Sequence, residues 1–150
     1  MDDRNKDAIS QLNSLIETCN DGAMGFETAA QEVKDSSTRQ LFQQYARERS
    51  QFADELRGAV EALGGHPDDG GSVSGAVHRG WMNIKSAIAG HDESAIIGEA
   101  ERGEDAAVAA YERALANDLP PQVEPVVRRQ FSQVKSAHDQ VRSLERAHHE

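Results

Sequence analysis

The sequence predicts a single all-helical domain, residues 1–150, built as a bundle of four long helices. Apolar residues recur every three or four positions through four long segments, which is the spacing of helices that each bury one face. Alanine is abundant and only 5% of the residues are aromatic, a composition that suits packed helices better than a β-sandwich. A chain of 150 residues has the length of one domain.

The first helix is predicted over residues 4–33. Its apolar positions alternate steps of three and four, as in a helical bundle, and they are Ile9, Leu12, Ile16, Cys19, Ala23, Phe26, Ala30 and Val33. Gly22 and Gly25 interrupt this pattern. Because a glycine in a helix interior costs up to ~1 kcal/mol, the two glycines indicate a bend or the close approach of another helix.

The second helix is predicted over residues 36–63. Gly64 and Gly65, followed by Pro67, end it. A polar turn precedes it, and the residues that can cap its first turn are Asp35, Ser36 and Ser37.

A shorter helix is predicted over about residues 74–89, within the connector that follows. Val77, Trp81, Ile84 and Ile88 mark its apolar face. At a rise of 1.5 Å per residue this helix is about 24 Å long, enough to carry the chain from one end of a bundle to the other. A bundle with one such crossover is the ferritin-like arrangement. The competing arrangement is a plain up-down bundle of five helices.

The last two long helices are predicted over residues 92–117 and 119–147. Asp92 can cap the first of them. Asp118 can cap the second, which then has its two prolines, Pro120 and Pro121, in the first turn, where proline is tolerated.

Charged residues interrupt the apolar pattern at several places. In the second helix the pattern falls on Glu48 or Arg49, so one of these two side chains must face the core or its edge, and the sequence leaves open which one. In the third long helix Glu101 and Glu104 occupy successive apolar positions, and in the fourth His138 does so. These positions are candidates for a buried polar site.

These charged residues lie at similar levels along the bundle axis when each predicted hairpin is folded about its turn. Glu48 then lies within one helical turn of Glu17, and a ferritin-like crossover brings it near the level of Glu104. The same folding places His138 level with Glu99. Carboxylate and imidazole ligands favour iron or manganese, so the sequence indicates a metal site with these candidate ligands: Glu17, Glu48, Glu101, Glu104 and His138.

The alternative is a buried polar layer without metal. Arg49 or Lys135 would pair with the inward carboxylates, because buried charges need partners and such layers can fix the register of helices. No intact Glu-x-x-His motif, the signature of dimetal bundle sites, occurs in the chain, and Lys135 stands where its glutamate would be. Both interpretations stay open at this point.

The chain resembles a bacterial family of ferritin-like four-helix-bundle proteins that is classed as a domain of unknown function. The residues that carry this resemblance are Leu12 to Glu17, Asp21-Gly22, Gly25-Phe26, Glu48-Arg49, Phe52, His78 to Trp81, Glu101 to Asp105, Tyr111 and His138. The resemblance implies a ferritin-like fold and no established reaction. A role in metal binding is what the wider ferritin-like class implies, and a role in stress physiology is what the family resemblance implies.

Charge and composition exclude some classes of binding partner and predict where the protein is located. A net charge of −10 opposes binding to nucleic acid and to anionic membranes, and no apolar run approaches the ~20 residues of a membrane span. A charged N-terminus and one cysteine, Cys19, lead us to expect a cytoplasmic protein. We expect no catalytic residues, with a ferroxidase-like oxidase as the enzymatic alternative. The non-metal alternative is an interaction module, either bound to a protein partner or forming a homodimer through Trp81 and Met82.

Overall fold

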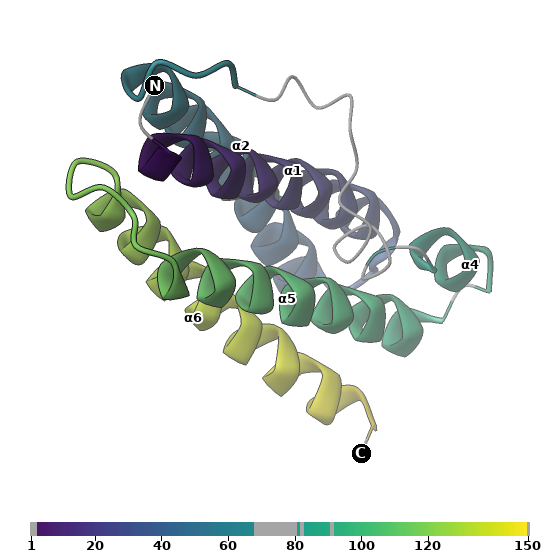
Figure 1. Cartoon of the computed structure of the whole chain (residues 1–150). Helices are drawn as coiled ribbons and strands as arrows, with labels where there is room; N and C mark the ends of the chain where they lie inside the picture. Colours follow the sequence, from purple (N-terminus) through teal and green to yellow (C-terminus); the bar gives the residue numbers. More distant parts are fainter. Residues whose placement is uncertain (1–2, 68–80, 82, 91, 150) are drawn as a thin grey trace.

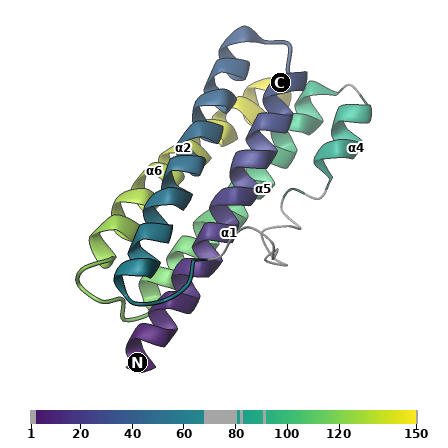
Figure 2. The ribbon, with the colours of Figure 1, turned by 90° about the horizontal axis from the view of Figure 1, so that it is seen from above.

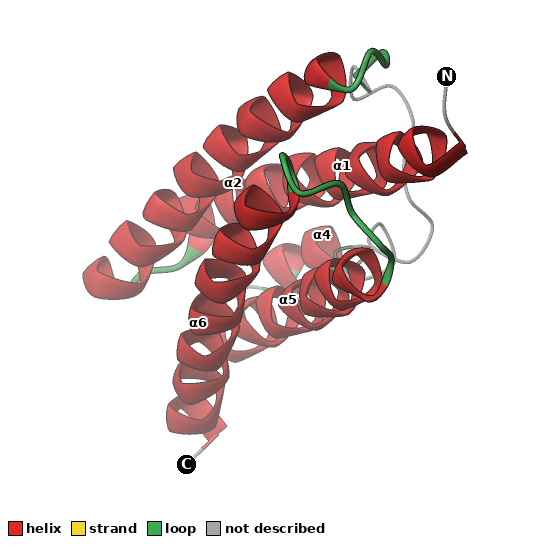
Figure 3. Ribbon diagram, turned by 60° about the vertical axis from the view of Figure 1, so that its left-hand side comes forward, coloured by secondary structure: helices red, strands yellow, loops and turns green. Residues whose placement is uncertain are grey.

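The computed structural model describes residues 3–67, 81, 83–90 and 92–149. This part of the chain contains five helices, arranged as in Figure 1, and it contains no strand (Figure 3). Within it, no helix combines the length and the apolar composition that a membrane crossing requires. The helices are α1 (Asp3–Glu32), α2 (Ser36–Ala62), α4 (Ile84–Ala89), α5 (Glu93–Ala116) and α6 (Glu124–His149).

The long helices form two antiparallel hairpins, α1–α2 and α5–α6, that pack against each other (Figure 2). The backbone N–H of Lys34, in the turn between α1 and α2, donates to the carboxylate of Glu93 in the first turn of α5 at 2.5 Å. Helix α5 therefore starts where α1 ends, and it runs parallel to α2. This direction requires a crossover along the whole bundle, which confirms the ferritin-like arrangement over the plain up-down bundle.

The crossover helix is described only in part. Helix α4 covers Ile84–Ala89 and packs on α1 and α5, whereas residues 74–80 of the predicted helix lie outside the described residues. Capping follows the sequence more closely. Asp35 accepts from the backbone N–H of Thr38 at 3.0 Å and caps α2, and Asp92 accepts from Ala95 at 3.3 Å and caps α5.

Helix α6 begins at Glu124, not at residue 119 as the sequence analysis predicts. Leu119 and Pro120 each precede a proline, and a residue in that position is disfavoured from the helical conformation. The chain instead makes a turn in which the carbonyl of Pro120 accepts from Val123 at 3.0 Å and from Glu124 at 3.1 Å. The later start shifts every residue of α6 along α5, with consequences for the site described below.

The core consists of two clusters of buried apolar side chains, one towards each end of the bundle. Leu12, Leu56 and Val127 belong to the first cluster, and Phe26 and Ile97 to the second. The apolar positions predicted for α1 supply both clusters. A layer of polar and charged side chains lies between them.

Trp81 links the crossover to the bundle by inserting between two glycines. A Cβ atom on Gly25 of α1 would lie 2.4 Å from the indole, and one on Gly103 of α5 would lie 2.2 Å from it. The indole also meets the Phe26 ring edge-on, with 5.1 Å between centroids. Trp81 is therefore a buried packing residue. Met82, the other residue of the predicted dimer surface, lies outside the described residues.

We expect Gly103→Ala to lower the free energy of unfolding by about 1–3 kcal/mol, because the new methyl group would overlap Trp81. Gly58→Ala is the matched control, since a Cβ at this exposed position of α2 would meet no atom within 4 Å. The control should raise the free energy by up to about 1 kcal/mol. Urea denaturation measures both changes, and a neutral Gly103→Ala would contradict the tight insertion of Trp81.

Candidate functional site

The polar layer centres on an ion pair between Arg49 of α2 and Glu104 of α5. Arg49 Nη1 donates to Glu104 Oε1 at 2.6 Å, and Nη2 donates to Oε2 at 2.5 Å. The two side chains are 1% and 0% exposed. This settles which residue of α2 faces inward: Arg49 enters the core, and Glu48 lies half-buried beside it.

The surroundings of Arg49 accommodate a large cation in the core. Gly22 provides the room, since a Cβ there would lie 3.2 Å from Arg49 Nη1. The guanidinium carbon lies 5.5 Å from the centroid of the Phe26 ring, within the range of a cation–π contact. Burial lowers the pKa of Arg49, but the Glu104 carboxylate outweighs this effect and leaves the pKa above its ordinary value. The guanidinium of Arg49 therefore keeps its positive charge in the core.

A chain of hydrogen bonds runs from the layer towards the surface. Cys19 Sγ lies 3.2 Å from the Tyr111 hydroxyl, which donates to Gln130 Oε1 at 2.7 Å. Gln130 Nε2 donates to Glu55 at 3.0 Å. Burial raises the pKa of the Cys19 thiol to about 11, so the thiol stays protonated at neutral pH and is a poor nucleophile.

The contacts of the interior glutamates decide whether they can act as the metal ligands expected from the sequence. Both carboxylate oxygens of Glu104 accept from Arg49. Glu17 and Glu48 are half-buried, and burial raises the pKa of Glu48. Among the described residues, no group of three or more acidic, histidine or cysteine side chains close enough to share an ion includes Glu17, Glu48 or Glu104. The interior is organised around a buried cation, and it does not fit a dimetal site.

A different cluster of possible ligands lies between α5 and α6. The ligand atoms of Glu101, Asp105 and His138 all lie within 4.8 Å of one another. His138 Nε2 is 2.5 Å from Asp105 Oδ1, and its Nδ1 is 3.2 Å from Asp139 Oδ1. Arg142 Nε donates to Glu101 at 3.2 Å. The structure thus unites two of the five predicted ligands, Glu101 and His138, with a third residue, Asp105.

Helical geometry explains how these side chains meet. Glu101 and Asp105 are four residues apart on α5, and His138 and Arg142 are four apart on α6, so each pair shares one face of its helix. The sequence analysis places His138 level with Glu99, and this is wrong because it starts α6 too early. The true start moves His138 along α5 to Asp105. The spacing of Asp105 from Glu101 was the signal that could have added it to the predicted ligands.

The cluster is suited to binding a cation from solvent. The side chain of His138 is 10% exposed and that of Asp105 is 55% exposed, while Glu101 is 17% exposed. Two carboxylates and one imidazole thus line a site that is fixed by the helix interface on one side and open to water on the other. Their chemistry matches hard or borderline divalent ions.

Comparisons with known proteins identify a family and a similar fold, and they name no activity. The model of a family described as "Domain of unknown function (DUF2383)" matches residues 7–117. Among solved structures, a Dps1 mutant from Mycobacterium smegmatis is similar with a TM-score of 0.75 and 12% identity, over 97% of this chain and 99% of that chain. At this identity the likeness concerns the fold alone. No curated protein sequence matches the chain.

We expect Glu104→Leu to lower the free energy of unfolding by about 3–5 kcal/mol, because it leaves the buried guanidinium of Arg49 without a counter-charge. The double variant Arg49→Met/Glu104→Leu should recover most of this loss, since apolar replacement of both partners of a buried pair is often neutral or stabilising. Denaturant titration measures both proteins. A single variant as stable as the unaltered chain would show that Glu104 does not neutralise a buried cation.

Proposed function

The chain belongs to the family described as a domain of unknown function (DUF2383), and from this premise we propose that it is a metal-binding bundle. It binds one divalent iron or manganese ion through Glu101, Asp105 and His138. The observation that carries this proposal is the convergence of three potential ligand atoms within 4.8 Å, from two helices. The function is binding, and no residue is assigned a catalytic role.

The donor set favours iron and manganese over softer metals. Carboxylate oxygens suit hard ions, imidazole suits borderline ions, and the cluster contains no thiolate. The one cysteine of the chain, Cys19, is buried in the core and hydrogen-bonded to Tyr111. A site of two carboxylates and one histidine leaves further coordination positions for water.

Neighbouring side chains support the orientation of the ligands. Asp139 lies 3.2 Å from Nδ1 of His138, and a carboxylate in this position commonly fixes the tautomer and the ring orientation of a metal-binding histidine. With Nδ1 held by Asp139, Nε2 is directed at Asp105, where the ion is proposed to bind. Of the other expected ligands, Glu104 is neutralised by Arg49, so the proposed site does not include it.

The unaltered protein should retain about one manganese or ferrous ion per chain, and Asp105→Asn and His138→Gln should each weaken binding by at least about tenfold. Calorimetric titration with Mn²⁺ and elemental analysis after desalting measure this. Glu112→Gln, which removes an exposed carboxylate elsewhere on α5, is the control and should bind normally. The proposal would be refuted if the unaltered protein failed to bind at millimolar metal. It would also be refuted if Glu48→Gln lost binding while Asp105→Asn and His138→Gln kept it, because that result would indicate an ion site in the interior.

Arg142→Gln should strengthen metal binding severalfold, up to about tenfold. Arg142 holds Glu101 through a hydrogen bond of 3.2 Å, so its guanidinium competes with the ion for this carboxylate and also repels it. Arg128→Gln, on the same helix and paired with Glu124, removes the same charge away from the cluster and should leave the affinity unchanged. Weaker binding in Arg142→Gln would show that the arginine supports the site instead of competing with the ion.

A further inference from the structure

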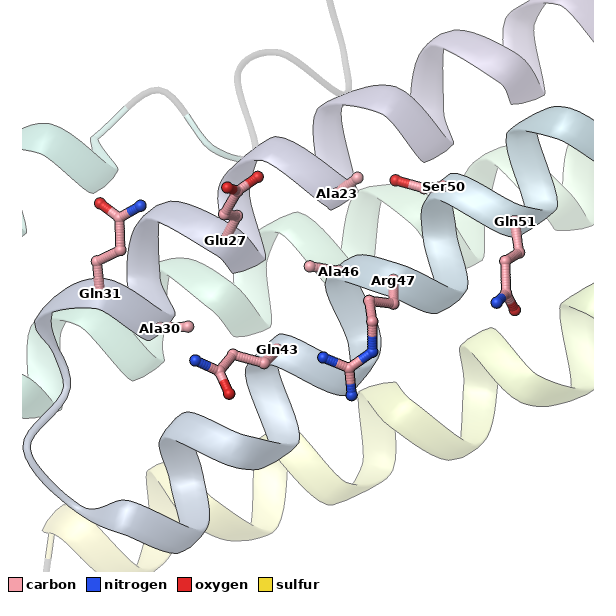
Figure 4. A pocket seen from close by; sticks show the side chains of 9 residues that line it. All are labelled: Ala23, Glu27, Ala30, Gln31, Gln43, Ala46, Arg47, Ser50 and Gln51. Atoms are coloured by element: carbon pink, nitrogen blue, oxygen red, sulfur yellow. The ribbon is translucent and has the colours of Figure 1, made fainter.

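A groove of about 650 Å³ runs along the outer face of the α1–α2 hairpin, away from the metal site proposed above (Figure 4). Its floor is made of small side chains, including Ala23 and Ala30 of α1 and Ala46 of α2. Small side chains let another helix approach closely, towards the short end of the usual 8–10 Å between packed helix axes. The small residues therefore allow the helices of another molecule to come close to this face.

The two sides of the groove carry opposite charges. Glu27 lies on the α1 side and Arg47 on the α2 side, and in Figure 4 the two side chains point away from each other. Both are exposed, and neither makes an ion pair or side-chain hydrogen bond in the described part of the protein. Two other exposed arginines are paired, Arg128 with Glu124 and Arg129 with a glutamate of α2.

We propose that this face, with Glu27 and Arg47 on its two sides, is where a second copy of the chain docks. A two-fold axis running along the groove would place α1 of each copy over α2 of the other. The acidic side then meets the basic side twice, so that Glu27 of each copy pairs with Arg47 of the other. A two-fold axis running across the helices would instead place like helices on each other and bring like charges together. Complementarity of charge selects partners and fixes their register, and here it favours the first arrangement.

The hairpin face is large enough for a stable dimer. Helices of this length extend for about 40 Å at 1.5 Å per residue, and two of them side by side present a face roughly 20 Å wide. The resulting area of roughly 800 Å² per copy equals what a standard protein interface buries on each side.

Sedimentation analysis of the full chain, with a metal chelator present, tests this proposal independently of metal binding. We expect a monomer–dimer equilibrium in which Glu27→Arg and Arg47→Glu each weaken the dimer at least about tenfold. The double reversal, Glu27→Arg with Arg47→Glu, should restore it, because the charges again match across the interface. Asp7→Arg, a charge reversal on α1 outside the groove, is the control. A monomer at every concentration, or a double reversal as weak as the single ones, would overturn the proposal.

Cross-linking with a short thiol-reactive linker tests the direction of the two-fold axis. A mixture of Glu27→Cys chains with Arg47→Cys chains should give linked heterodimers, whereas each variant alone should give few. The native Cys19 is buried, so the unaltered chain serves as the unlinked control. Efficient linking of Glu27→Cys to itself would mean that α1 packs on α1, and it would overturn the arrangement proposed here.

Discussion

The buried ion pair between Arg49 and Glu104 is the constraint on which the rest of the structure depends. It joins α2 of one hairpin to α5 of the other, so it fixes how the two hairpins are aligned along their length. Two charges removed from water are tolerated only when they pair with each other. A shift of α2 along α5 would separate the two charges and lower the free energy of unfolding. The absence of a side chain at Gly22 and the ring of Phe26 shape the space for the guanidinium.

This pair also decides where binding chemistry can occur. A carboxylate that accepts two hydrogen bonds from a guanidinium has little left to offer an ion, and the centre of the bundle is therefore closed to the dimetal chemistry that four inward carboxylates would support. A group of possible ligands that Arg49 does not occupy lies instead at the α5–α6 interface. There Glu101 and Asp105 share one face of α5 and meet His138 of α6, within reach of solvent.

Glycine has a consistent role in this bundle, which is to admit a large side chain between helices. Gly22 admits Arg49, and Gly25 and Gly103 admit Trp81 from the crossover. Each glycine weakens its own helix by up to ~1 kcal/mol, and the packing of a buried indole or a paired guanidinium offsets this cost. The groove on the outer face of α1 and α2 is of a different kind. Alanine forms its floor, and it is flanked by Glu27 and Arg47, which form no ion pair with any residue that the structure describes.

The sequence by itself determined the long helices and the Asp92 cap, because periodicity and capping are local properties of the chain. It left three candidate caps for α2 and allowed both a crossover and a plain up-down bundle, and contacts in the folded chain decided for Asp35 and for the crossover. The sequence also marked the polar layer. Only the tertiary structure decided that Arg49, not Glu48, enters the core, since both positions flank the same apolar stripe and the choice depends on Glu104 of another helix. Likewise, the proline turn before Glu124 set which residues of α5 and α6 meet. The register between two helices depends on where the loop between them ends and on how their side chains pack, and neither can be read from one segment of the chain.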